Sequence, residues 1–97
     1  GCTGITSLKG FEYIEKLNMD YCDRVTSIEP LIRVKELSMR HCDSINDVSP
    51  VKECIKLDIS YTKITDVSML RKLEKVILTG LEKVTFNVLR QDIVYLR

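Results

Sequence analysis

The feature that most constrains this chain is a repeat of about 20 residues along most of its length. The tripeptide at 17–19 recurs at 37–39, 57–59 and 76–78, so the third step is one residue shorter than the two before it. Further apolar residues recur at fixed positions before and after each tripeptide. Each repeat has about six apolar positions, too few to close a core alone. Stacked coils would bury them against one another, so the repeat predicts a solenoid.

Each repeat contains one short segment with the pattern of a half-buried strand. Polar and apolar residues alternate in 16–20, 36–40 and 56–60. A period of two indicates a strand with one buried face, and strands one coil apart run in the same direction. Pro30 and Pro50 interrupt the rest of the coil, so we expect extended or 3₁₀ segments there.

The repeat assigns the chain to a single domain. The predicted coils are 1–10 (partial), 11–31, 32–51, 52–70, 71–90 and 91–97 (partial). In the last coil we align Ile93 with Leu73 and Leu96 with Val76, while Asn87 and Arg90 occupy positions that are apolar elsewhere. Neither end shows a polar capping repeat, so we expect further chain or a partner to cover the ends.

A cysteine follows two of the predicted strands, at Cys22 and Cys42. The repeat with this recurring cysteine resembles the cysteine-containing leucine-rich repeats of kinetoplastid parasites and some bacteria. The segments 42–50 (CDSINDVSP) and 64–68 (ITDVS) also carry this resemblance. The resemblance covers roughly residues 2–85. It implies an α/β-class, mostly β repeat solenoid: a right-handed superhelix with a parallel concave sheet and extended or 3₁₀ convex segments. It also implies protein–protein binding on the concave sheet.

Composition excludes two broad classes of function. The 97 residues contain 15 Lys and Arg against 14 Asp and Glu, a net charge of +1. Nucleic-acid binders usually carry a clear basic excess, so no nucleic-acid partner is predicted. No apolar run approaches the roughly 18 residues of a membrane-spanning helix, so we predict no membrane insertion.

Four cysteines raise the question of disulfides or metal. Cys2, Cys22 and Cys42 occupy one periodic position, which favours buried, reduced, structural thiols. This predicts an intracellular, reducing compartment, either the cytoplasm or an organelle. Oxidation between neighbouring coils is the weaker alternative. Without a C-x-x-C pair, we predict no metal site.

The single histidine, His41, aligns with Tyr21 and Tyr61, which suggests a surface row rather than a catalytic base. The sequence shows no glycine-rich phosphate loop, nucleophile elbow or clustered carboxylate pair. We therefore predict no catalytic or cofactor-binding residues, no cofactor and no enzyme activity.

The open face of the sheet is the best candidate site. Parallel stacking predicts an alternating charge row of Lys16, Glu36 and Lys56, and places Asp20 beside Arg40. Tyr and Arg are favoured in interfaces, although the same surface could be only a solvated sheet with weak ion pairs. The predicted partner-binding residues are Lys16, Asn18, Asp20, Tyr21, Glu36, Arg40, His41, Lys56, Asp58 and Tyr61.

Three functions fit these features. The leading one is a non-enzymatic module that binds a protein partner through the concave sheet face. The alternative is a structural subunit, or a segment of one, in a large assembly that contacts its neighbours through its coil edges. A weaker alternative is the substrate-recruiting part of a ubiquitin ligase, which would need an adaptor-binding motif that this sequence does not contain.

Overall fold

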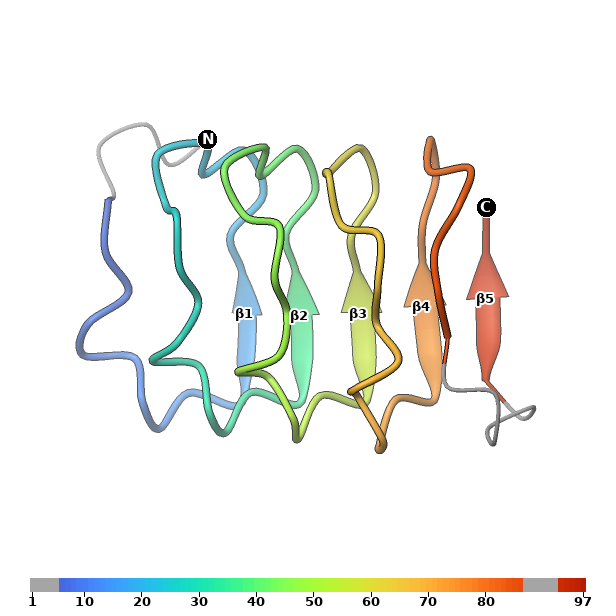
Figure 1. Ribbon diagram of the computed structural model, residues 1–97. Helices are drawn as coiled ribbons and strands as arrows, with labels where there is room; N and C mark the ends of the chain where they lie inside the picture. The colour runs from blue at the N-terminus through green and yellow to red at the C-terminus, as the bar shows by residue number, and fades with distance from the viewer. Residues whose placement is uncertain (1–5, 87–92) are drawn as a thin grey trace.

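The computed structural model describes residues 6–86 and 93–97, and these residues form a parallel β-solenoid with one short strand per coil (Figure 1). All neighbouring strands are parallel, in the order β1-β2-β3-β4-β5. The strands are β1 (Lys16–Asn18), β2 (Glu36–Ser38), β3 (Lys56–Asp58), β4 (Lys75–Ile77) and β5 (Val94–Leu96). The predicted fold class, a mostly β solenoid with a parallel sheet, is confirmed.

Hydrogen bonds join each strand to the strand of the next coil. The amide of Met19 donates to the carbonyl of Ser38 at 2.8 Å, and the amide of Met39 donates to the carbonyl of Asp58 at 2.9 Å. The central residues of β2, β3 and β4 are buried in the solenoid and their two neighbours point outward, as the alternating sequence requires. The pattern therefore sets which residues are available on the open face.

The return half of each coil is a series of tight turns that bury every third residue. In the coil of β1 these are Cys22, Val25, Ile28 and Leu31. The amide of Leu31 donates to the carbonyl of Ile28 at 3.0 Å, three residues earlier. The residues the structure describes contain no helix, and hydrogen bonds between residues three apart close the turns of the return segments.

A polar side chain closes the same turn in successive coils. The carboxylate of Asp47 accepts a hydrogen bond from the amide of Ser49 at 2.9 Å, and Asp66 accepts one from the amide of Ser68 at 2.8 Å. Such a bond to the backbone two residues on is the usual reason for Asp in a turn, and it explains the repeated Asp-Val-Ser. The hydroxyl and the amide of Ser68 together hold the pKa of Asp66 below its ordinary value.

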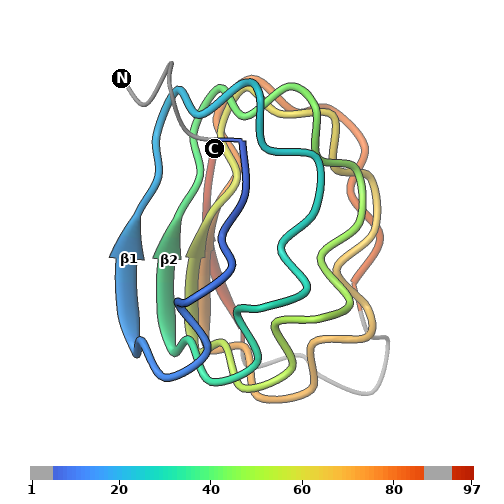
Figure 2. The ribbon, with the colours of Figure 1, turned by 90° about the vertical axis from the view of Figure 1, so that its left-hand side faces the viewer.

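Figure 2 shows the sheet on one side of the solenoid and the return segments on the other. The buried side chains of both form one continuous core. Met19, Met39 and Ile59 lie at the same position in three successive coils, and each is buried. The inward residues of the return segments, such as Val25 and Ile45, complete this core from the opposite side. Burial is therefore shared between coils, as the sequence predicted.

The sequence alignment of the last coil was wrong by one residue. In the structure Val76 pairs with Tyr95, and Ile77 pairs with Leu96. Leu96 therefore points outward and is 46% exposed, while Tyr95 stacks on Phe86 with ring centroids 5.1 Å apart. The step from β4 to β5 is therefore as short as the step from β3 to β4, and it is one residue shorter than the two steps from β1 to β3.

Some predictions concern segments outside the described residues. These are the positions of Cys2, Asn87 and Arg90 and part of the first partial coil. Within the described part of the chain, no helix is long and apolar enough to span a membrane.

Candidate functional site

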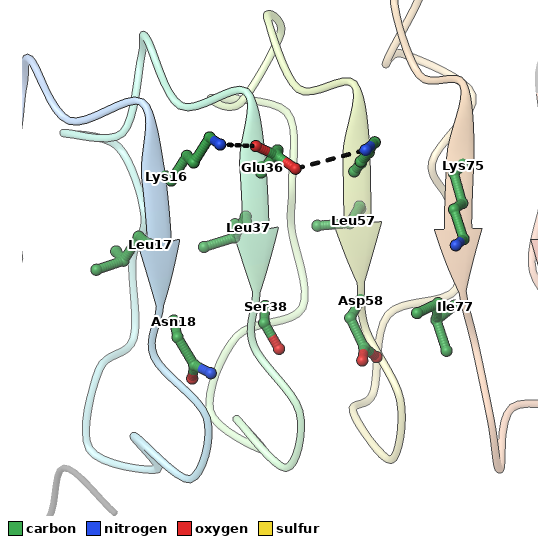
Figure 3. A pocket seen from close by; sticks show the side chains of 11 residues that line it. Lys16, Leu17, Asn18, Glu36, Leu37, Ser38, Leu57, Asp58, Lys75 and Ile77 are labelled. Carbon is green, nitrogen blue, oxygen red and sulfur yellow. Dashed lines mark ion pairs between the residues drawn. The ribbon is translucent and has the colours of Figure 1, made fainter.

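The open face of the sheet is hollowed across β1 to β4 into a shallow depression of about 420 Å³. Figure 3 shows the outward side chains of these strands standing over it. The depression is lined by Lys16, Leu17, Asn18, Glu36, Leu37, Ser38, Lys56, Leu57, Asp58, Lys75 and Ile77. Half of the predicted site residues, those on the strands themselves, lie in this one depression.

The predicted row of alternating charge is confirmed. Glu36 lies between two lysines, with carboxylate oxygens 3.0 Å from the ammonium nitrogen of Lys16 and 3.7 Å from that of Lys56 (Figure 3). The hydrogen bond from Lys16 is the main cause that holds the pKa of Glu36 below its ordinary value, and the charge of Lys56 adds to it. Both ion pairs face solvent, so they order the face more than they stabilise the fold.

The predicted placement of Asp20 beside Arg40 is confirmed, and the contact is made by the Arg40 backbone rather than by its side chain. The Asp20 carboxylate accepts hydrogen bonds from the backbone amide of Arg40 at 2.9 Å and from the Ser38 hydroxyl at 2.6 Å. A short carboxylate reaches the adjacent backbone, whereas the long Arg40 side chain reaches one strand further. Its Nε lies 3.8 Å from a carboxylate oxygen of Asp58, and its guanidinium carbon lies 5.9 Å from the ring centroid of Tyr61.

Tyr21, His41 and Tyr61 form a stacked column at the carboxyl ends of β1 to β3. The ring centroids are 4.7 and 4.6 Å apart, with interplanar angles of 9° and 13°. This is close to the strand spacing of about 4.8 Å, so the sheet itself sets the stacking distance. The predicted surface row is therefore real, and most of the ring faces within it are covered by neighbouring rings.

The same three residues have an unusual backbone conformation that the sequence did not reveal. Their φ angles are 64°, 60° and 60°, in the left-handed region that costs residues other than glycine roughly 1–2 kcal/mol. Gly80 occupies the position in the fourth coil with φ 82°, and a Cβ there would lie 2.7 Å from the Tyr61 ring. The alignment of Gly80 with these three residues was the one sign in the sequence that this position has a positive φ angle.

Two further predicted residues shape the turns that follow their strands. A side-chain oxygen of Asn18 accepts a hydrogen bond from the amide of Asp20 at 3.0 Å, and Asp58 does the same for the amide of Ser60 at 3.0 Å. Asn18 and Asp58 therefore hold the local backbone while facing the depression.

The cysteines contact the backbone of the core. The thiol of Cys42 donates to the carbonyl of Met19 at 3.0 Å, and in the next coil the hydroxyl of Thr62 donates to the carbonyl of Ile59 at 2.6 Å. Cys54 is buried, which raises its pKa to about 12. A thiol of this kind stays protonated and is a poor nucleophile.

The sequence analysis missed residues at the far end of the face. Lys75 and Ile77 line the depression, and Val94 and Leu96 lie beside them on β5. The positions equivalent to Ile77 in the earlier coils are polar, namely Asn18, Ser38 and Asp58. An isoleucine there was a sign in the sequence that the open face becomes apolar at β4. Val94 and Leu96 were missed because the last strand was aligned one residue out of register.

Among the described residues, no three His, Cys, Asp or Glu side chains are grouped so that they could hold a metal ion. No family model, curated protein or solved structure matches the chain. The surface chemistry of the solenoid is therefore the basis for its functional interpretation.

Proposed function

We propose that this chain is a leucine-rich-repeat module without enzymatic activity that binds a protein partner through the open face of its sheet. The observation that carries the proposal is the depression across β1 to β4, which is lined by polar and charged side chains and lies over the continuous core. Repeat solenoids commonly bind partners on such extended faces.

The leucine-rich-repeat assignment is supported by three features that occur together. These are the short sequence repeat, one parallel strand per coil, and a small buried residue after each of three strands. That residue is Cys22, Cys42 or Thr62 in successive coils. The first two residues also carry the resemblance noted in the sequence.

Binding is favoured over catalysis because the side chains most suited to chemistry are already engaged. The ring of His41 is stacked between those of Tyr21 and Tyr61. Burial raises the pKa of Cys54 to about 12. By contrast, Arg40 contributes a cation beside Tyr61 at the border of the open face, and Arg and Tyr frequently dominate interface energies. The buried thiols also fit a reducing, intracellular compartment.

A second candidate function uses the opposite edge of the coils, where the chain enters each strand. Tyr13 is 77% exposed there, and the guanidinium carbon of Arg33 lies 4.7 Å from its ring centroid. A hollow of about 650 Å³ lies along this edge, with ion pairs Lys35–Glu15 and Lys72–Glu53 beside it. This edge favours a structural subunit that contacts its neighbours side by side.

Site-specific photo-crosslinking in an extract of the source cells distinguishes the two functions. A photoreactive phenylalanine analogue replaces Lys56 on the face, Tyr13 on the edge, or Lys52 on a return segment as the matched control. The face proposal predicts a protein adduct from position 56 and none from position 52. Adducts from position 13 alone would contradict it and support the structural subunit.

Substituting Tyr21, Arg40 and Tyr61 together with Ala would test the face less cleanly than a single substitution. Removing both tyrosines also removes the ring stack and leaves Ala in the left-handed backbone region. Loss of stability would then be confused with loss of binding. Arg40→Gln alone tests the contribution of the guanidinium while keeping the aromatic column.

A further inference from the structure

The two last strands give the open face a different chemistry from the first three. Ile77 on β4 pairs in register with Leu96 on β5, and Lys75 pairs with Val94. Residues paired in register point to the same side, so all four side chains belong to the open face. Val94 is 56% exposed and Leu96 is 46% exposed. We call Lys75, Ile77, Val94 and Leu96 the end patch.

Stacking another coil against β5 would cover only the flanks of these side chains, as β5 does for Ile77, which stays partly exposed. A neighbouring strand pairs with the backbone edge of β5, whereas Val94 and Leu96 point out of the sheet plane. Something that lies on the open face is needed to remove the rest of their apolar surface from water. Adjacent exposed apolar side chains of this kind commonly mark interaction sites.

The charge of Lys75 indicates what that occupant carries. Its neighbour on β3 is Lys56, a like charge, and its neighbour on β5 is Val94, which is apolar. Glu36, the carboxylate of this row, contacts Lys16 and Lys56 instead. Among the described residues no acidic group pairs with Lys75, so its ammonium group is available to a carboxylate from outside.

We propose that the end patch binds a polypeptide segment of the partner in which an Asp or Glu lies near an aliphatic or aromatic side chain. The carboxylate pairs with Lys75, and the apolar side chain packs on Ile77, Val94 and Leu96. In an extended segment, alternate side chains are about 7 Å apart on one face, so an acid two residues from an apolar residue fits this layout. This inference rests on the proposed function and names the chemistry of its partner.

The test is a selection from a displayed library of random twelve-residue peptides, with the whole chain as bait. The expected result is enrichment of peptides with Asp or Glu two residues from Leu, Ile or Phe. Lys75→Glu should weaken the selected peptides about tenfold, because attraction becomes repulsion. Leu96→Ser should weaken them as well. Lys52→Glu, the same charge change on a return segment, should leave binding unchanged, and circular dichroism should show that all variants remain folded.

The outcomes separate this inference from the function on which it rests. If selected peptides lack the acidic residue, or if Lys56→Glu weakens them and Lys75→Glu does not, the end patch is wrong while binding at the face stands. If no peptide is enriched, or if binding survives every substitution on the face, both fail. Sedimentation that shows a dimer of the chain abolished by Leu96→Ser would also overturn the inference, because the patch would then hold a second copy.

Discussion

The first three strands and the last two strands differ in whether their outward side chains interact with those of the next coil. On β1 to β3, outward and edge residues interact with the next coil, as in the Glu36 ion pairs and the Tyr21–His41–Tyr61 stack. On β4 and β5 the corresponding positions hold Lys75, Ile77, Val94 and Leu96, and no ion pair or ring stack joins these four described residues.

The comparison shows when surface side chains of a solenoid can pair with those of the next coil. They do so only where equivalent positions in neighbouring coils hold residues that can form ion pairs or stack. The fourth coil departs in several columns, because Ile77 follows Asn, Ser and Asp, and Gly80 follows the three rings. The core meanwhile continues without interruption through Val76 and Leu78. Surface chemistry therefore changes along the molecule while the supporting fold does not.

The largest expected effect comes from removing a core side chain of β2. Leu37→Ala should destabilise the fold by about 2–5 kcal/mol, because Leu37 is buried against two neighbouring coils. Ile77→Ala on the open face should cost about 0.5 kcal/mol or less. Urea denaturation of both variants measures the difference. Equal losses would contradict the assignment of inward and outward columns.

A smaller change in stability is expected for substitutions at the left-handed positions, which are the aromatic column and Gly80. Gly80→Ala should cost roughly 1–2 kcal/mol, since Ala tolerates a positive φ poorly and its Cβ meets the Tyr61 ring. The same order of Gly over Ala is expected at position 41, because His41→Gly and His41→Ala both lose the stack but only Gly fits the left-handed backbone. We expect the Gly variant to be more stable than the Ala variant by about 0.5–1 kcal/mol. Thermal melts compare them, and a more stable His41→Ala variant would be inconsistent with the left-handed backbone.

The smallest effect is electrostatic and depends on pH. Lys16 and Lys56 lower the pKa of Glu36 in the folded chain, so the unfolded chain binds more protons in the acidic range. The contribution of Glu36 to stability is therefore present above its unfolded pKa, and it is lost as pH falls through the lowered folded pKa.

Melting temperatures of the wild type and Glu36→Gln, measured from neutral to acidic pH, test this dependence. The two curves should converge at acidic pH, and added salt should reduce their separation at neutral pH. Glu29→Gln on a return segment is the matched control. A separation that grows as pH falls would contradict the predicted sign.

Most of the core and the parallel sheet were predictable because a repeat fixes burial independently of long-range contacts. The same repeat register predicts that Tyr21, His41 and Tyr61 lie in one row, as they do. It did not reveal their positive φ angles, since aromatic residues seldom adopt that conformation. The end patch was missed for a different reason: the last step could follow either the longer or the shorter spacing, and a slip of one residue exchanges the inner and outer faces.

The central claim is that each coil shares its backbone hydrogen bonds and its interior with the next. Scalar couplings across hydrogen bonds, measured by NMR on an isotope-labelled sample, test this directly. We expect couplings from the Met39 amide to the Asp58 carbonyl and from the Leu78 amide to the Leu96 carbonyl. Couplings that instead join these amides to carbonyls four residues earlier in the chain would indicate helices and contradict the solenoid.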